Sequence, residues 1–222
     1  EVIKQRIIVY FVAIVVLVAA LLLCISSFKK VEAISQVEEV KEAKVNERVS
    51  MEENKNKLPE ISREELEAAK KAGSGSLCEL VSRKALESVG GKLDSESMPK
   101  LTSSQITIIG YIILRRELLE GGFVQLIHNG YGPFFFENPF AKAMREMGLK
   151  ELCNMLYDVR RLYEKTAGEI TRDCSDEEFM ALYEKFEKYD EYDDEYVERE
   201  TEYTEAVGSY IEANIDEFLT IR

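Results

Sequence analysis

The first pattern along the chain is one long apolar run near its beginning. Residues 7–28, IIVYFVAIVVLVAALLLCISSF, contain no Asp, Glu, Lys or Arg. At about 1.5 Å of rise per residue, a helix of this length crosses a hydrocarbon core of about 30 Å. Helices buried in soluble proteins seldom lack a polar face over so many residues. Residues 1–28 are therefore predicted to be a short tail followed by a transmembrane helix.

Two other interpretations of this run stay open. Lys4 and Arg6 form the short basic lead that precedes a cleaved signal peptide. Against that reading, the run is longer than the usual apolar region, and no small-x-small cleavage site directly follows it. Cys24 would suit a lipid-modified cysteine, but Leu23 stands where a small residue is expected. We therefore predict an uncleaved, single-pass membrane anchor.

The orientation of this anchor stays open too. Five basic residues follow the span within about 20 positions, which favours a cytoplasmic C-terminal body by the positive-inside rule. They are Lys29, Lys30, Lys41, Lys44 and Arg48. A very short basic N-terminal tail, however, is what stays inside when a signal anchor exports the part that follows it. The two arguments nearly cancel.

Residues 29–76 mix charges of both signs almost evenly, as a juxtamembrane helix or a solvated stalk does. Ser62 with Glu65 has the capping-box pattern of a short helix. The sequence GSGS at 73–76 predicts a flexible joint. We therefore expect a charged stalk or linker over residues 29–76 and a folded domain over residues 77–222.

From residue 77 onward the apolar positions recur at helical spacing. The stripe that begins at Leu77 stops at Gly90, and the next begins after Thr102 and Ser103, which are residues that cap helices well. The isoleucines of this second stripe would also suit a strand. Its length favours a helix.

Further helices are predicted after residue 137. Asn138 followed by Pro139 is a cap and a favoured first helical residue, and Gly148 ends that helix. The apolar pattern then resumes over residues 149–165. Because no hairpin turn joins alternating runs, the sequence predicts an all-α fold: a transmembrane helix, a helical or flexible stalk, and a compact multi-helix domain.

Composition adds a localised negative charge. The chain has 42 acidic and 29 basic residues, a formal charge of −13. Residues 176–205 alone hold 14 Asp or Glu against Lys185, Lys188 and Arg199. Binding to nucleic acid draws on Lys and Arg that displace counterions from phosphates, so direct nucleic-acid binding is not expected. A protein with a basic surface is the more natural partner.

The acidic segment also carries a regular series of aromatic rings. Ser175 with Glu178 predicts the start of a helix. Beyond it, tyrosines recur every seven residues, at Tyr189, Tyr196, Tyr203 and Tyr210. This spacing places the rings on one side of a helix and the carboxylates on the other. The rings are either part of the core or, since tyrosine is enriched in interfaces, part of a binding surface.

Candidate chemistry centres on residues 120–130, EGGFVQLIHNG. A phosphate-binding loop needs glycines followed by a Lys and a hydroxyl, and Gly121 and Gly122 are followed by Phe, Val and Gln. His128 is the only histidine and Cys153 is a conceivable partner for it, but a nucleophile paired with a base also needs an orienting group, which the sequence cannot place. The cysteines show no zinc spacing, and the acidic segment lacks the glycine of a calcium loop. No catalytic residue, metal or cofactor is predicted.

A helix stop explains more of this stretch. With Gly122 in the left-handed position that follows a helix, Phe123 and Leu118 become the apolar pair that meets in a Schellman cap. Gln125 and Asn129 then share the polar side of a short turn that ends at Gly130.

The stretch GGFVQLIHNGYG, with FAKAMREMGLKELCNMLYDVRRLYEK after it, resembles a bacterial family named after a DNA-mimic protein, formerly a domain of unknown function. The shared positions are Gly121, Gly122, Phe123, Gln125, Asn129, Met147 and Gly148. The resemblance is dense from about residue 118 to 165. Leu126 and Ile127 depart from it, since aromatic residues are common there, and so does the membrane anchor.

This resemblance implies an all-helical, dimerising domain without known catalysis. It also implies an acidic surface that imitates duplex phosphates and occupies the DNA-binding face of a transcription regulator. The candidate partner-binding carboxylates here are Asp190, Glu191, Asp193, Asp194, Glu195, Glu198, Glu200, Glu202 and Glu205. A merely solvated acidic face is the plainer reading of the same residues.

The sequence thus favours a non-catalytic interaction module, anchored in the inner membrane of a bacterium, that binds a basic partner protein through acidic C-terminal helices. A structural, oligomerising protein of the cell envelope, assembled through the tyrosine stripe and the stalk, is the alternative. An enzyme of unknown reaction ranks third.

Overall fold

The computed structural model describes residues 58–222. The predicted transmembrane helix at residues 7–28 and the first part of the predicted stalk lie outside the described residues. Among the helices of residues 58–222, none combines the length and the apolar character that crossing a membrane requires.

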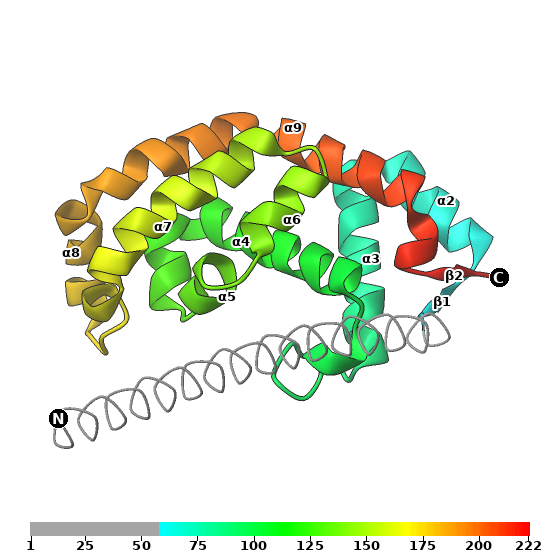
Figure 1. The fold of residues 1–222 in the computed structure, drawn as a ribbon, viewed down its shortest axis with the longest axis horizontal. Coiled ribbons are helices and arrows are strands. Elements are labelled where there is room, and N and C mark those ends of the chain that lie inside the picture. Colours follow the sequence, from blue (N-terminus) through cyan, green and yellow to red (C-terminus); the bar gives the residue numbers. More distant parts are fainter. Residues whose placement is uncertain (1–57) are drawn as a thin grey trace, which may run out of the picture. The chain divides into compact units, whose positions relative to one another are not determined.

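The described part is helical apart from one pair of very short strands (Figure 1). Its elements in chain order are β1 (Glu60–Ile61), α2 (Arg63–Ala72), α3 (Ser74–Ser88), the 3-10 helix η1 (Met98–Lys100), α4 (Ser103–His128), α5 (Gly132–Phe136), α6 (Phe140–Glu146), α7 (Lys150–Ile170), α8 (Asp176–Lys185), η2 (Glu187–Tyr189), α9 (Asp190–Ala213), η3 (Ile215–Glu217) and β2 (Thr220–Ile221). The all-helical prediction for the folded domain is confirmed.

The strands join the two ends of this part of the chain. β1 and β2 pair in parallel, with Glu60 opposite Thr220 and Ile61 opposite Ile221. Ile61 is only 2% exposed, and Leu66 of α2 is equally buried. The segment just before α3 is therefore fixed to the domain by hydrogen bonds and by buried apolar side chains.

The predicted flexible joint at residues 73–76 is wrong. Gly73, with a φ of 111°, forms a tight turn, and α3 already begins at Ser74. Ser74 lies so close to Gly208 of α9 that a Cβ on that glycine would come within 2.5 Å of the serine Cβ. Small residues serve close helix packing here. The folded domain therefore extends upstream of residue 77 and includes β1 and α2.

The helix starts follow the predicted caps. Thr102 and Gln105 form a complete capping box at the start of α4, and Ser62 accepts the Glu65 N–H at 3.1 Å before α2. At α6 the prediction is wrong by one residue, because Pro139 is the N-cap and the helix begins at Phe140, whose N–H the Asn138 side chain accepts at 3.0 Å. Each side chain satisfies an N–H group that has no partner within its helix.

The helix ends follow the predicted glycines. Gly90, Gly130 and Gly148 have φ values of 99°, 82° and 91°. At Gly148 the amide bonds back to the Arg145 carbonyl at 3.0 Å, and the next amide bonds to the Met144 carbonyl at 2.9 Å. This pair of bonds defines a Schellman cap, which a glycine at positive φ permits.

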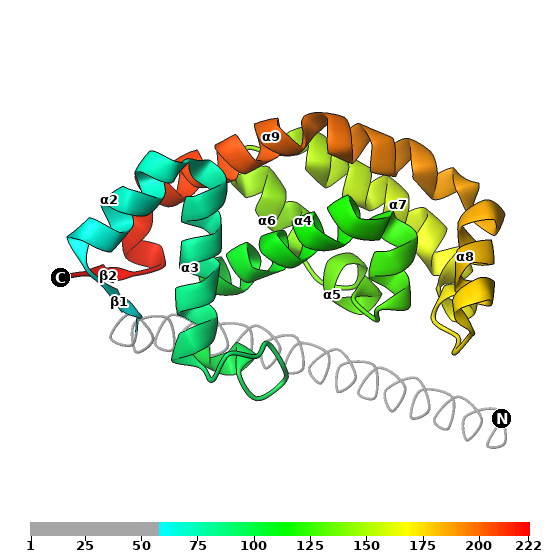
Figure 2. The same cartoon turned by 180° about the vertical axis from the view of Figure 1, so that it is seen from behind.

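The core forms around α4. This helix runs through the middle of the domain, with α3, α7 and α9 packed around it (Figures 1 and 2). α9 extends along one edge, from α8 to the end that carries the strands. Since α9 packs against both α3 and α4, its inner face belongs to the core, and only its outer face is free for a partner.

Candidate interaction surface

The acidic segment folds as two helices. α8 starts at the predicted Ser175–Glu178 capping box, in which each side chain accepts the other residue's backbone N–H. After the short η2, α9 begins with Asp190, Glu191 and Asp193 in its first turn. Carboxylates at this end interact favourably with the helix dipole, so the local sequence stabilises the helix that displays them.

The tyrosines of the seven-residue series belong mainly to the core. Tyr189, Tyr196 and Tyr203 are at most 1% exposed, and Tyr210 is half-buried. Their spacing keeps them on the inner face of α9, which leaves the intervening carboxylates outside. The core interpretation of the tyrosine stripe is confirmed.

Seven of the nine candidate carboxylates are exposed on the outer face of α9. Glu202 is paired, because Arg199 donates two guanidinium bonds to it at 3.0 and 3.1 Å. Within residues 58–222 the other six form no ion pair. We call these six the α9 carboxylate row: Asp190, Glu191, Asp194, Glu195, Glu198 and Glu205.

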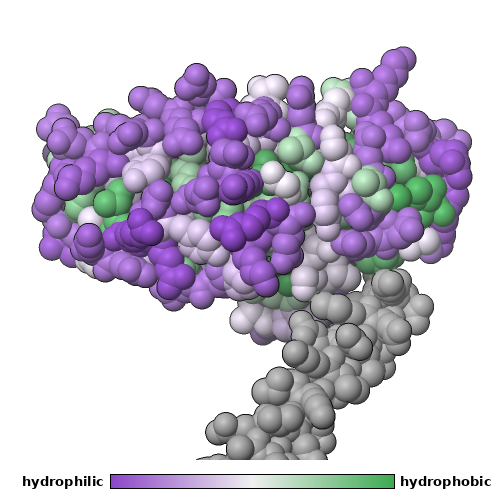
Figure 3. Space-filling model, turned by 45° about the horizontal axis from the view of Figure 1, so that its top comes forward, coloured by the Kyte–Doolittle hydropathy of each residue, from purple (hydrophilic) through white to green (hydrophobic). Residues whose placement is uncertain are grey.

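Hydrophilic side chains dominate this side of the domain. Figure 3, tilted so that the α9 side comes forward, shows them over most of the surface, with small hydrophobic areas between them. The row carries about one charge per 4 Å of helix axis at 1.5 Å of rise per residue, compared with about 3.4 Å for one strand of duplex DNA. The average charge density along the row is therefore close to that of a single phosphate strand.

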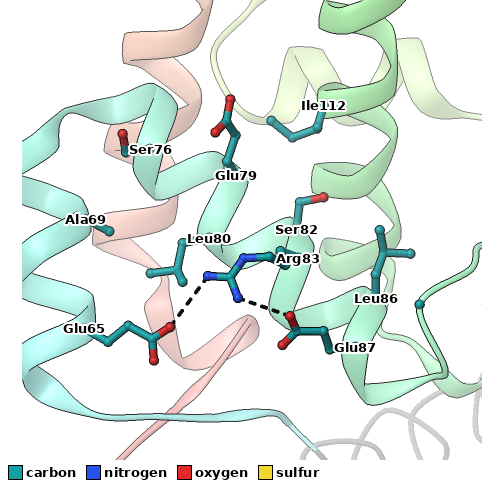
Figure 4. A pocket seen from close by; sticks show the side chains of 11 residues that line it. Glu65, Ala69, Ser76, Glu79, Leu80, Ser82, Arg83, Leu86, Glu87 and Ile112 are labelled. Atoms are coloured by element: carbon teal, nitrogen blue, oxygen red, sulfur yellow. Dashed lines mark hydrogen bonds and ion pairs between the residues drawn. The ribbon is translucent and has the colours of Figure 1, made fainter.

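Some acidic residues elsewhere on the domain are paired with cations, as in an open pocket between α2, α3 and α4 (Figure 4). The pocket has a volume of about 660 Å³. Arg83 lies in it between Glu65 and Glu87, at 3.6 and 3.1 Å, and Lys84 reaches Glu65 at 3.1 Å. The carboxylates here are held by the protein's own cations, unlike those of the α9 carboxylate row.

Asp193 is turned inward. Its carboxylate accepts the Phe123 N–H at 2.8 Å and lies directly against Gly122 of α4. Burial, with Asp190 and Asp194 nearby, raises the pKa of Asp193 to about 7, and the bond from Phe123 only partly opposes this shift. This residue fastens α9 to α4 and is not available to a partner.

Glu200 is also internal. Arg115 of α4 donates to it at 2.6 Å, and Thr204 donates at 2.7 Å and is itself bonded to the Tyr111 hydroxyl at 2.7 Å. Partial burial opposes ionisation, but the bonds from Arg115 and Thr204 hold the pKa of Glu200 below its ordinary value. Arg115 reaches Glu79 of α3 as well, at 3.7 Å, so this group links three helices.

The Gly121–Gly122 step breaks α4 at the predicted position, but in a different conformation. Gly122 has a φ of 70° and a ψ of −168°, a combination that only glycine adopts readily. The left-handed Schellman geometry predicted for it is therefore wrong, and the chain continues after the kink as a short helix from Phe123. The Tyr183 hydroxyl of α8 donates to the Gly121 carbonyl at 3.1 Å. Both acidic helices thus contact this kink.

Two other residues of the resemblance, Gln125 and Asn129, surround a buried carboxylate. Glu117 is 3% exposed and accepts bonds from Gln125 at 3.2 Å and from Asn129 at 2.7 Å. Arg116 donates to its second oxygen at 2.9 Å. A buried charge requires such partners, so Gln125 and Asn129 hold the turn after the kink in place.

His128 has a structural position. Its Nδ1 lies 2.8 Å from the Ile170 carbonyl, and its ring lies 4.5 Å from that of Phe179. Cys153 is buried in α7 as a small apolar side chain. In residues 58–222 no three His, Cys, Asp or Glu side chains are grouped so as to hold a metal ion.

Sequence reasoning missed Glu117 and Arg115, and included Asp193 and Glu200 among the exposed carboxylates. A signal for the last two exists. Each stands four residues after a buried tyrosine, Tyr189 or Tyr196, and residues four apart share a helix face. Nothing comparable marks Glu117.

Fold and surface together define an all-helical domain with a carboxylate-rich helix along one edge. The family model for DMP19-like proteins matches residues 99–214. The chain is also 31% identical over 127 residues to the DNA mimic protein DMP19 of Neisseria meningitidis serogroup B (strain MC58), an alignment that covers 57% of this chain and 77% of the relative. The chain belongs to the DMP19-like protein family.

Proposed function

We propose that this protein is a non-catalytic interaction module that binds a basic, DNA-binding protein through the α9 carboxylate row, in the manner of a DNA mimic. The observation that carries the proposal is the set of six exposed carboxylates without an ion pair in residues 58–222. Like charges this close repel one another, and a cationic partner removes that repulsion. The name of the Neisseria relative supports mimicry.

The rigid attachment of α9 to the rest of the domain supports the same proposal. A mimic of duplex phosphates needs charges on a rigid surface, because ordering flexible side chains and loops weakens binding. α9 is fixed by buried Tyr196 and Tyr203 and by the bonds of Asp193 and Glu200 to α4. The charges of the row thus lie on a helix whose inner face is packed against the domain along much of its length.

The proposal extends to the N-terminal region. The uncharged residues 7–28 would anchor the module in a bacterial inner membrane, and the side on which residues 58–222 lie stays open. A homodimer is part of the proposal through the family resemblance. The alternative, an assembly through the tyrosine stripe and the stalk, is less favoured, since three of the four tyrosine rings are in the core.

Displacement from DNA tests the proposal. The full chain is added to duplex-DNA resin loaded with the DNA-binding proteins of a bacterial extract, and released proteins are identified. One variant neutralises Glu191, Asp194, Glu195 and Glu198 as amides. A matched control neutralises four exposed carboxylates on other elements, Glu64, Glu96, Asp173 and Asp216.

We expect the wild type and the control to release a discrete protein and the α9 variant to release none. Absence of release by the wild type would contradict the proposal. Equal release by both variants would contradict it too, because net charge alone would then explain the effect.

A further inference from the structure

α4 and α9 pack side by side in antiparallel register. The register is fixed by three contacts: Tyr111 with Thr204 at 2.7 Å, Arg115 with Glu200 at 2.6 Å, and Phe123 with Asp193 at 2.8 Å. Residue numbers rise along α4 as they fall along α9. For any position between two of these contacts, the register therefore gives the residue at the same level on the other helix. We call the line along which the two helices pack the α4–α9 seam.

Two large apolar side chains stand exposed on these helices, one on each. Leu119 is 44% exposed, and Val197 is 54% exposed. Both lie about midway between the contact of Arg115 with Glu200 and that of Phe123 with Asp193, so the register places them at the same level. On the α9 helix Val197 also shares the α4-facing side with Asp193 and Glu200, its neighbours at four and three residues.

Carboxylates border this apolar pair. Asp194 lies one helical turn before Val197, Asp190 two turns before it and Glu198 directly after it. All three belong to the α9 carboxylate row. On α4, exposed Glu120 follows Leu119. An exposed apolar pair within an acidic rim has the composition of an interface centre, where apolar anchors lie inside a polar border.

We infer that Leu119 and Val197 form an apolar anchor point for a basic amphipathic helix of the partner protein. This inference rests on the proposed function and specifies its partner. An apolar side chain of the partner helix would lie over the α4–α9 seam, and Lys or Arg one turn away on either side would reach the carboxylates. A helical partner fits this surface, because residues three or four apart rise by about 5 Å along any α-helix. Side chains of the partner helix therefore recur at the same spacing as those of α9.

Charge decides between the possible occupants of this surface. A second copy of the chain would bring its own carboxylate row against this one, and an anionic lipid surface would be repelled in the same way. Only a cationic partner is complementary. Carboxylates alone would accept any sufficiently basic helix. The apolar pair adds a preference for basic helices that also carry an apolar side chain at the matching position.

Two synthetic helical peptides of equal charge provide the test. Both carry Lys at the same positions, and the stripe between the lysines is Leu in one and Ser in the other. Binding to the full chain in zwitterionic nanodiscs is measured at low salt. The variants are Leu119→Ser with Val197→Ser, the near-isosteric Val197→Thr, and Tyr157→Ser, an exposed apolar control on α7.

We expect the wild type and the Tyr157→Ser control to prefer the Leu peptide by about tenfold or more, the order expected when one or two apolar side chains are buried. The double variant should lose this preference and Val197→Thr should reduce it, with binding of the Ser peptide unchanged. Equal binding of both peptides by the wild type, or a preference retained by the double variant, overturns the anchor and leaves the carboxylate row intact. Failure of the wild type to bind either peptide overturns the proposed function as well.

Discussion

Asp193 of α9 accepts the backbone N–H of Phe123 in α4 at 2.8 Å, across 70 residues of sequence. The bond lies at the glycine kink, where the same carboxylate contacts Gly122. It ties the helix that displays the α9 carboxylate row to the glycine kink of α4, and both lie within residues 99–214, which match the family model. The stability of this junction and the presentation of the row are therefore coupled.

The first prediction concerns pH. Burial raises the pKa of Asp193 from its ordinary value of 3.8 to about 7, so the folded state holds a proton that the unfolded chain releases. The stabilisation linked to this proton is complete below about pH 4 and is lost as the pH rises towards 7 and above. Asp193→Asn keeps an acceptor for Phe123 but does not titrate. We expect the variant to be more stable than the wild type at pH 8 by about 1–2 kcal/mol, after allowance for partial exposure.

Thermal unfolding from pH 4 to pH 8 measures this difference. Because the two proteins differ only at position 193, the comparison isolates that residue. Parallel stability profiles for the two proteins would show that Asp193 is not the group responsible.

The second prediction concerns the kink. Gly122→Ala places a Cβ against the Asp193 carboxylate and forces alanine into a backbone region that it avoids. We expect a loss of about 3 kcal/mol in the free energy of unfolding. Gly130→Ala is the matched control, since Gly130 has a φ of 82° but no atom within 4 Å of an added Cβ. It should cost only about 1 kcal/mol. Urea unfolding that gives equal losses would remove the role assigned to the contact with Asp193.

The third prediction concerns Glu117, the buried carboxylate that accepts hydrogen bonds from Gln125 and Asn129. Glu117→Ala leaves the amides of Gln125 and Asn129 without their acceptor, and we expect a loss of about 2–4 kcal/mol in the free energy of unfolding. Glu120→Ala, three residues further along α4 and exposed, should unfold at the wild-type urea concentration. If both variants behave like the wild type, Gln125 and Asn129 need another explanation.

The fourth prediction compares two tyrosines of the seven-residue series, Tyr189 and Tyr203, whose hydroxyl groups differ in hydrogen bonding. The Tyr203 hydroxyl is buried with no hydrogen-bond partner in residues 58–222, whereas the Tyr189 hydroxyl is bonded to Thr166 at 2.7 Å. Tyr203→Phe should leave stability unchanged or raise it by up to about 1 kcal/mol, and Tyr189→Phe should lower it by about 1 kcal/mol. Differential scanning calorimetry measures both. A lower melting temperature for Tyr203→Phe would reveal a partner for that hydroxyl.

Local sequence signals were sufficient for most helix boundaries. The caps at Thr102 and Ser175 and the glycines at 90, 130 and 148 act within a few residues, so they can be recognised without knowledge of the fold. The same reasoning failed at residues 73–76. Small residues are compatible both with flexibility and with close packing, and the contact with Gly208 that decides between them is distant in sequence.

The candidate surface was predictable to the extent that helical periodicity defines it. The seven-residue series separated rings from carboxylates and placed the α9 carboxylate row correctly on the outer face. The pairing of Glu200 with Arg115 was not predictable, because it joins residues 85 apart that meet only when α4 and α9 pack. The exposed side of α9 could be predicted from the sequence, but the contacts that hold α9 to the domain could not.

Under the proposed function, the α9 carboxylate row binds a basic partner as DNA phosphates would. The most direct measurement is the salt dependence of the affinity between the full chain and the protein that it displaces from DNA. Neutralising Glu191, Asp194, Glu195 and Glu198 should lower the affinity at low salt and flatten the slope of log K against log salt concentration, since fewer ionic contacts remain. The control neutralised at Glu64, Glu96, Asp173 and Asp216 should keep the wild-type slope. An affinity and a slope that are unchanged in the α9 variant would contradict the account.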